Sequence, residues 1–180
     1  PLVIRTIIGR GWGQGPQHSQ NFQAMFAQVP GLKVVSPTTP YQAKGLMAAA
    51  IEDPDPVIFV EHRWLHGQVG DVPEDNYSIP IGKAHIMHEG EDLTVVTSLD
   101  MAVEALKVAE KLESQKIDIE VVDLCTVKPL DEETILNSVR KTGRLLVIDS
   151  SWKDFGAASQ VTALVAEKGH DHLKGAIRRL

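Results

Sequence analysis

The stretch GRGWGQGPQHSQ, residues 9–20, places a histidine directly after four alternating glycines. Glycine adopts positive φ without strain and carries no side chain, so a ligand can approach such a backbone closely. His18 lies at the start of an expected amphipathic helix, where unpaired N–H groups and the helix dipole favour anions. An imidazole there could donate a hydrogen bond or a proton to developing negative charge. We therefore predict that the chain presents His18 at a cleft.

The glycine spacing matches no phosphate-binding motif. No Gly-Lys-Ser/Thr follows it, and G-x-G-x-x-G does not occur in it. A tolerant surface loop is an equally good explanation of the glycines alone. Histidine pairs elsewhere resemble metal ligands only superficially, because 62 and 66 straddle a strand end while 85 and 88 point to opposite faces of a strand. Glu61, at the end of an apolar strand, is either a buried acid or a rim residue.

A second group of polar atoms follows the helix expected over residues 40–53. The last helical carbonyls, together with Asp53 and Asp55 of the Asp-Pro-Asp-Pro turn, offer hard oxygen ligands. Such ligands suit a cation like potassium or calcium. A capping turn with solvated acids is the alternative. Cys125 follows an apolar strand and is expected to be an inert small residue.

Alternating apolar and amphipathic segments must position these residues. The Thr39-Pro40-Tyr41-Gln42 sequence predicts a capping box with proline at the first helical position. Short connections between alternating strands and helices favour parallel sheets, and Ser98 is expected to cap a helix. The pattern therefore predicts an α/β fold with two mainly parallel sheets flanked by helices. The expected strands are 2–8, 32–35, 57–60, 84–87, 93–97, 119–124, 145–148 and 176–180, and the helices 21–28, 40–53, 98–115, 131–143 and 156–168.

Periodicity is lost near residues 65–80, which are rich in Gly, Pro and acids. Such composition is typical of a linker. We expect a first domain over 1–66, a linker over 67–80 and a second domain over 81–180. The sequence begins in one strand-like run, without an initiator Met, and ends in another. We therefore expect it to be a fragment, or only the ordered part, of a longer protein, with the end of its second domain missing.

Composition limits the classes of function. The chain carries 18 basic and 24 acidic residues, a net charge of −6, which argues against broad nucleic-acid binding. Its single cysteine excludes an intrachain disulfide framework. No secretory signal and no apolar run of membrane length is apparent, so no membrane partner is expected. These features predict a cytoplasmic location.

Several motifs together resemble a known family. They are QHSQ at 17–20, PGLKVVSP at 30–37, IPIGKA at 79–84 and KPLDEETI with KTGRL between 128 and 145. In combination the chain resembles, over nearly its whole length, the beta subunit of the thiamine-diphosphate-dependent component of 2-oxo acid dehydrogenases, in the transketolase-like superfamily. Pyruvate, branched-chain and acetoin dehydrogenases belong to this group. The first segment would then be the second half of a pyrimidine-binding domain, and the second a transketolase C-terminal-type domain.

The resemblance implies roles for particular residues. His18 matches the family's active-site histidine, near the thiazolium of the cofactor, where it assists proton handling and acyl transfer to a lipoyl group. Gln17, Ser19 and Gln20 would orient it or line the cleft. In the family a structural potassium ion lies after the helix expected over 40–53. The residues that match that segment are Ala50, Ile51, Asp53 and Asp55, with Asp55 where many relatives carry Asn.

The resemblance also implies partners and a compartment. Thiamine diphosphate would be shared with an alpha subunit in an alpha2beta2 heterotetramer, and the alpha subunit would hold magnesium and the diphosphate. A lipoyl acyltransferase component would accept the acyl group, and the location would be the mitochondrial matrix in a eukaryote. The family's cofactor-activating glutamate has no counterpart in these 180 residues, so this fragment alone is expected to be inactive. Cys125 stands where relatives usually carry Arg.

The function that follows is oxidative decarboxylation of a 2-oxo acid with acyl transfer to a lipoyl group. Two alternatives stay open. A transketolase or deoxyxylulose-phosphate synthase half shares the domain order, although the QHSQ and PGLKVVSP segments fit it less well. A non-catalytic assembly module that docks partner subunits would explain a chain without the cofactor-activating half.

Overall fold

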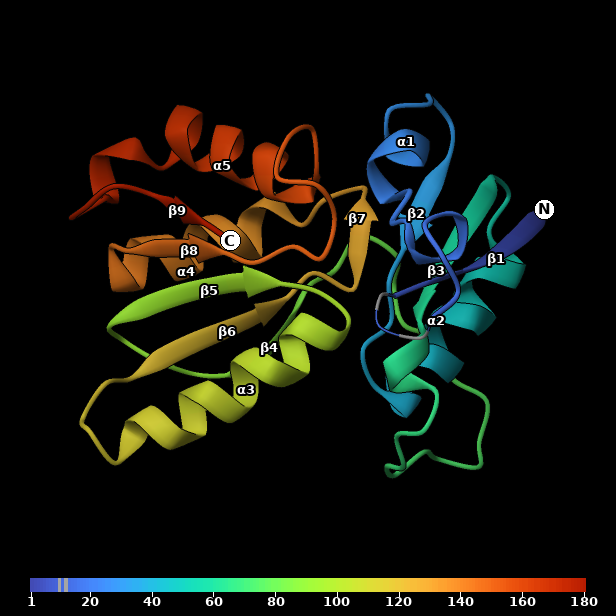
Figure 1. Cartoon of the computed structure of the whole chain (residues 1–180), viewed down its shortest axis with the longest axis horizontal. Coiled ribbons are helices and arrows are strands. Elements are labelled where there is room, and N and C mark those ends of the chain that lie inside the picture. The colour runs from blue at the N-terminus through green and yellow to red at the C-terminus, as the bar shows by residue number, and fades with distance from the viewer. Residues whose placement is uncertain (10, 12) are drawn as a thin grey trace.

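The computed structural model describes residues 1–9, 11 and 13–180. Arg10 and Trp12, both within the predicted glycine-rich stretch, lie outside the described residues. The described chain forms two β-sheets that lie side by side, each with its own helices (Figure 1). The two mainly parallel sheets flanked by helices that the sequence predicts are confirmed.

The first sheet has the strand order β1-β3-β2-β7. Strands β1 (Leu2–Ile8), β3 (Pro56–His62) and β2 (Lys33–Val35) are parallel, as two strand–helix–strand connections require. Helix α2 (Pro40–Glu52) packs on one face, and α1 (Gln23–Ala27) packs on the other. Short 3-10 turns, η1 (Gln17–Ser19) and η2 (Arg63–Leu65), follow β1 and β3. Both turns therefore lie beyond the carboxyl ends of the parallel strands.

Helix α2 begins as the sequence predicts. The Thr39 hydroxyl accepts the N–H of Gln42 at 3.2 Å, and the Gln42 side-chain oxygen accepts the N–H of Thr39 at 3.1 Å. These reciprocal bonds satisfy donors that a helix start leaves unpaired. Pro40 occupies the first helical position, where its missing N–H costs nothing. The predicted capping box is confirmed.

The second sheet has the order β4-β6-β5-β8-β9. Only β4 (His85–His88) runs antiparallel, against β6 (Ile119–Asp123). Strands β5 and β8 are parallel to their neighbours. Helix α3 covers one face, while α4 and α5 cover the other (Figure 1). The remaining bounds are β5 (Leu93–Thr97), α3 (Asp100–Glu113), α4 (Glu132–Thr142), β8 (Leu145–Val147), α5 (Ala157–Lys168), η3 (His170–His172) and β9 (Arg178–Arg179).

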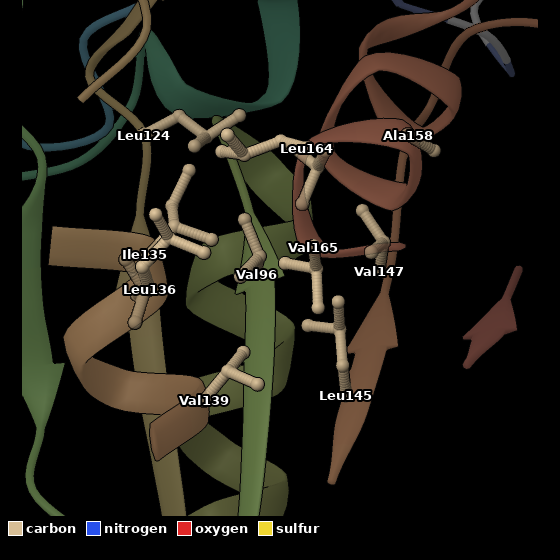
Figure 2. Close-up of a cluster of buried hydrophobic side chains, with 12 residues drawn as sticks. Val96, Leu124, Ile135, Leu136, Val139, Leu145, Val147, Ala158, Leu164 and Val165 are labelled. Atoms are coloured by element: carbon tan, nitrogen blue, oxygen red, sulfur yellow. The ribbon is translucent and has the colours of Figure 1, made fainter. Parts of the chain in front are cut away.

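The largest core cluster fills the space between the second sheet and helices α4 and α5 (Figure 2). Branched aliphatic side chains from both helices interdigitate with those of β5 and β8. Helix α4 carries its cap signals at both ends. The Asp131 carboxylate accepts the N–H of Thr134 at 3.3 Å, and Gly143 ends the helix in the left-handed conformation. The members of the cluster are Val96, Val122, Leu124, Ile135, Leu136, Val139, Leu145, Val147, Ala158, Val161, Leu164 and Val165.

The connection over residues 67–84 contains no helix or strand, but it is packed against α2. The Tyr77 hydroxyl donates to the Tyr41 carbonyl at 2.8 Å, and the two rings stack 4.6 Å apart. The Lys44 ammonium donates to the carbonyls of Pro73 and Asp75. The predicted linker is thus a strap that follows the helix surface. The exact division of the chain at 66 and 80 stays a prediction.

Several local expectations are wrong. Strand β7 (Thr126–Lys128) was not expected, and it extends the first sheet antiparallel to β2 although it follows β6 of the second sheet. Ser98 does not cap α3, because Leu99 is the N-cap residue and makes no side-chain cap bond. Helix α1 is shorter than the predicted 21–28, because it begins at Gln23 and ends at Ala27. The Asn21 side chain accepts the N–H of Gln23 at 3.0 Å.

Candidate functional site at the boundary between the sheets

Polar side chains gather where the carboxyl ends of strands from both sheets meet. Gly9 follows β1 and His62 ends β3, while Asp100 and Asp149 follow β5 and β8. In open parallel sheets this edge is where ligands bind. These four residues line one cavity of about 760 Å³, together with parts of α3 and of the segment after η1.

The predicted catalytic segment lies at the rim of this cavity. His18 is exposed on the 3-10 turn η1, and Gln17 and Gln20 are exposed beside it. Ser19 is half-buried and is the member of this group that lines the cavity. Its hydroxyl donates to the Gly15 carbonyl at 2.9 Å, which closes the turn. The imidazole of His18 is therefore presented outward, as a site shared with another protein surface requires.

His62 is the buried histidine of the cavity. Its side chain is 5% exposed, and its Nε2 lies 3.5 Å from Oδ1 of Asp100. Its Nδ1 accepts the N–H of Trp64 at 3.3 Å, which caps η2. Asp100 belongs to the second sheet's α3, so this contact crosses the boundary between the two halves of the fold.

Asp100 pays a desolvation cost at this position. Burial raises the pKa of its carboxyl group, while the His62 charge and the N–H groups of Met101 and Asp100 oppose that shift. Among the described residues, its Oδ1 accepts no hydrogen bond. The preceding residue, Leu99, has φ 56° and ψ −135°, a conformation that costs energy for a branched side chain. Leu99 is fully buried in the core of the first sheet, and this packing holds the strained residue in place.

A second contact crosses the same boundary through Asp123, which is fully buried. The Gln42 side-chain amide donates to its Oδ2 at 3.0 Å, and the N–H of Cys125 donates to its Oδ1 at 3.3 Å. The Thr38 hydroxyl also stabilises the carboxylate. Burial still dominates, and it raises the pKa of the Asp123 carboxyl group.

Cys125 packs into the core of the first sheet and is buried. Burial and the neighbouring Asp123 carboxylate raise the pKa of its thiol strongly. A thiol that stays protonated is a poor nucleophile and a poor metal ligand. The prediction of an inert Cys125 is confirmed.

The two acids of the Asp-Pro-Asp-Pro turn are paired with the Lys33 side chain. The Lys33 ammonium contacts both carboxylate oxygens of Asp53 at 2.7 Å and lies 3.3 Å from the Asp55 carboxylate. This pairing raises the pKa of Lys33, and the pKa of Asp53 is lowered although burial opposes the shift. Ala50 is buried at the end of α2, whereas the Ile51 side chain is exposed.

Over residues 1–9, 11 and 13–180, no group of three or more His, Cys, Asp or Glu side chains could hold a metal ion. His66 instead contacts the Glu61 carboxylate at 3.2 Å, and Glu61 also accepts two bonds from Arg5. Glu61 is thus a paired acid at the end of β3. In the same described part of the chain, no helix is long and apolar enough to cross a membrane.

Comparison with known proteins decides the family. The sequence profile "Transketolase, C-terminal domain" matches residues 82–180, and "Transketolase, pyrimidine binding domain" matches residues 1–68. The chain belongs to the transketolase family. A solved structure described as a split-gene transketolase, inactive beta4 tetramer, superposes with a TM-score of 0.79 at 23% identity. The superposition covers 98% of this chain and 55% of that one.

Curated relatives are named as beta subunits. The beta subunit of acetoin:2,6-dichlorophenolindophenol oxidoreductase of Cupriavidus necator is 46% identical over 98% of this chain and 52% of its own length. The pyruvate dehydrogenase E1 component subunit beta of Acholeplasma laidlawii is 44% identical over 98% and 54%. The 2-oxoisovalerate dehydrogenase subunit beta of Bacillus subtilis is 44% identical over 100% and 55%. The chain spans about half the length of the curated relatives it matches.

The sequence drew attention to the exposed residues at the rim of this cavity, whose role stays a prediction, and it gave no indication of the buried contact between His62 and Asp100. The glycines and His18 stand out because their spacing is unusual. Asp100 gave no signal, since an acid in the first turn of a helix is common. His62 was considered only as a metal ligand with His66, and its partner instead comes from the other half of the chain, 38 residues away.

Proposed function

We propose that the chain is part of the beta subunit of a thiamine-diphosphate-dependent 2-oxo acid dehydrogenase. The observation that carries this proposal is the naming of relatives that are 42–46% identical over 98–100% of the chain. They are named as beta subunits of pyruvate dehydrogenase, one of them from Arabidopsis thaliana, of 2-oxoisovalerate dehydrogenase and of acetoin:2,6-dichlorophenolindophenol oxidoreductase. Its reaction would be oxidative decarboxylation of a 2-oxo acid and transfer of the acyl group to a lipoyl group. The partners would be an alpha subunit in an alpha2beta2 assembly and a lipoyl acyltransferase component.

Within this proposal His18 is the catalytic residue, and Gln17, Ser19 and Gln20 line the cofactor cleft. The exposure of Gln17, His18 and Gln20 supports the proposal, because a half-site completed by a second subunit must present its groups outward. Thiamine diphosphate, when bound, supplies a thiazolium that stabilises a carbanion. The imidazole of His18 would hold or give a proton at the oxygen of the bound acyl group. Ser19, tied to Gly15, would fix the direction in which the imidazole is presented.

Magnesium and the diphosphate would be held by the alpha subunit. The proposal therefore assigns to this chain the pyrimidine side of the cofactor. We assign the location by the same relatives, as the cytoplasm of a bacterium or the compartment for which the Arabidopsis thaliana relative is named, the mitochondrion.

We also propose a potassium ion at the end of α2, held by Ala50, Ile51, Asp53 and Asp55. The Asp53 and Asp55 carboxylates already contact Lys33, so the ion would be bound by main-chain carbonyls. The last carbonyls of a helix lack intrahelical partners, which makes them available. Thermal unfolding of the assembled enzyme in KCl and in NaCl tests the site. Equal midpoints in the two salts would contradict it.

The experiment that tests the function uses the full-length subunit carrying this sequence, co-expressed with its alpha subunit. Calorimetry measures thiamine diphosphate binding, and a dye-reduction assay compares pyruvate, acetoin and 3-methyl-2-oxobutanoate. We expect binding, and turnover of pyruvate or 3-methyl-2-oxobutanoate. Turnover of acetoin alone would contradict the assignment to a 2-oxo acid dehydrogenase. Turnover of ketose phosphates alone would indicate a transketolase half instead. An assembly that binds no thiamine diphosphate would indicate a non-catalytic module.

A further inference from the structure

Gly9, the first residue of the glycine-rich stretch, lies against the His62 ring. In the parallel register Ile8 pairs with His62, so Gly9 leaves β1 directly beside the imidazole. Gly9 has φ 127°, and a Cβ built on it would lie 3.0 Å from Nε2 of His62. Only glycine combines that backbone conformation with room for the ring. The position of the imidazole therefore determines where the stretch begins.

The hydrogen bonds of His62 determine where its proton lies. Because Nδ1 accepts the N–H of Trp64, it carries no proton, and the neutral ring must be protonated at Nε2. Nε2 is the atom that lies against Gly9 and faces Oδ1 of Asp100. One end of the ring is thus tied to the first half of the fold, and the other end is directed at the second half.

Asp100 is held in place independently of His62. It is the first residue of α3, and the preceding Leu99 is buried in the first sheet's core. The N–H of Leu99 donates to the Thr38 hydroxyl at 3.0 Å, across the boundary. The nearest acid along α3, Glu104, is paired with Lys107 at 2.7 Å. Asp100 is therefore a fixed acceptor against which the imidazole can be oriented.

We propose that His62 and Asp100 are positioning residues that hold Gly9, and through it the segment carrying His18, in the geometry the reaction needs. The inference rests on the proposed function for its catalytic consequence. Neither residue needs to touch the reacting atoms. Their effect on the segment itself is measurable whether or not the enzyme is a 2-oxo acid dehydrogenase.

The test compares four variants of the full-length subunit assembled with its alpha partner. His62→Asn keeps an acceptor for the Trp64 N–H but is too short to reach Asp100. His62→Gln places an amide N–H₂ near the former Nε2. Asp100→Asn removes the carboxylate charge at the boundary. Glu110→Gln is the matched control, because it removes the same charge from an exposed position of the same helix that does not line the cavity.

The first readout is hydrogen exchange of the peptide covering residues 9–20, measured by mass spectrometry. We expect His62→Asn and Asp100→Asn to speed its exchange about tenfold, since local opening needs less free energy. His62→Gln should restore part of the protection, and Glu110→Gln should match the parent. The second readout is lipoyl acylation, for which kcat should fall about tenfold while KM for the 2-oxo acid changes less than about twofold.

Combining His62→Asn with Asp100→Asn should give no larger effect than either change alone, because both break one contact. Exchange of residues 9–20 at the parental rate in both single variants would overturn the proposal, as would additive effects in the double variant. If His62→Asn fails to fold, Asp100→Asn carries the test alone. Failure of the proposed function would remove the activity readout but leave the exchange result intact, so the two failures are distinguishable.

Discussion

Two carboxylates of the second half, Asp123 and Asp100, contact side chains of the first half, and they differ in how completely their oxygens are paired. The Asp123 carboxylate is fully buried, and it accepts bonds from Gln42 and from the Cys125 backbone. The Asp100 carboxylate borders an open cavity, and its Oδ1 lies 3.5 Å from Nε2 of His62 and accepts no hydrogen bond among the described residues. The first contact is a closed network, while the second is adjacent to the residues expected to do chemistry.

This difference indicates that the Asp123 contact and the His62–Asp100 contact have different roles. A buried polar network whose members are all paired gives a unique arrangement, and its disruption is costly. A contact that is longer and partly solvated stabilises less, but it can orient a neighbouring segment without locking it. The Asp123 contact fixes how the two sheets meet, and the His62–Asp100 contact adjusts the segment at their shared edge.

Gln42→Ala is expected to cause the largest loss of unfolding free energy. This change removes the side chain that caps α2 and contacts Asp123, and it leaves the N–H groups of Thr38 and Thr39 without their acceptor. A lost cap and buried unpaired groups together cost about 3 kcal/mol of unfolding free energy. Urea unfolding measures the loss. Gln115→Ala, on the exposed side of α3's end, is the control, and equal stability of the two variants would contradict the role given to this contact.

Gly9→Ala should cause the second-largest loss of unfolding free energy. The positive φ and the contact with His62 Nε2 both oppose a methyl group there, at a cost of about 2 kcal/mol. Gly13→Ala separates these causes, since Gly13 also has positive φ but nothing lies within 4 Å of its added Cβ. Urea unfolding should show the larger loss for Gly9→Ala. The same loss at both positions would mean that the His62 ring does not confine the chain.

The pH dependence of stability sharpens the comparison further. Burial raises the pKa of the folded-state Asp123 carboxyl group, so the folded protein binds this proton more tightly than the unfolded chain does. Stability attributable to Asp123 should then fall as pH rises above about 3.9, its unfolded value, through the folded pKa. Unfolding midpoints at several pH values, for the parent and for Asp123→Asn, isolate this group. The midpoint of the parent should fall relative to that of Asp123→Asn as pH rises. A parental midpoint that rises relative to the variant would contradict the prediction.

The smallest effect is expected for Glu104→Gln. Glu104 lines the same cavity as Asp100, but its side chain is exposed and pairs only with Lys107 among the described residues. A surface pair of this kind contributes within about 0.5 kcal/mol. Thermal unfolding should show no resolved change. A loss comparable to that of Asp100→Asn would mean that cavity charge in general, rather than the His62 contact, matters at this edge.

The sequence predicts those parts of the fold that depend on local signals. The Thr39–Gln42 capping box, the Asp131 and Gly143 ends of α4, and the parallel strands all follow from short patterns. The expected Ser98 cap is wrong because packing of Leu99 into the other sheet's core overrides local capping preference. Strand β7 was missed for a related reason, since its partner β2 lies about 90 residues earlier in the chain.

The candidate site divides in the same way. His18 was singled out from glycine spacing and an expected helix start, but the structure places it on the separate turn η1 and not at the start of α1, and its catalytic role stays a prediction. The pairing of His62 with Asp100 depends on how two sheets meet, and no spacing in the sequence encodes it. Likewise, the acids of the Asp-Pro-Asp-Pro turn looked free in the sequence, whereas the fold brings Lys33 from β2 onto both of them.

The most direct test of the account is His18→Ala in the full-length subunit assembled with its alpha partner. Thiamine diphosphate affinity and the unfolding midpoint should stay at the parental values, because His18 is exposed. Acyl transfer to a free lipoyl domain should fall at least about a hundredfold, as expected for loss of a proton-transfer group. Gln14→Ala, in the same exposed segment, serves as the control. Acyl transfer by His18→Ala at the parental rate would contradict the central claim that this chain contributes His18 to a shared active site.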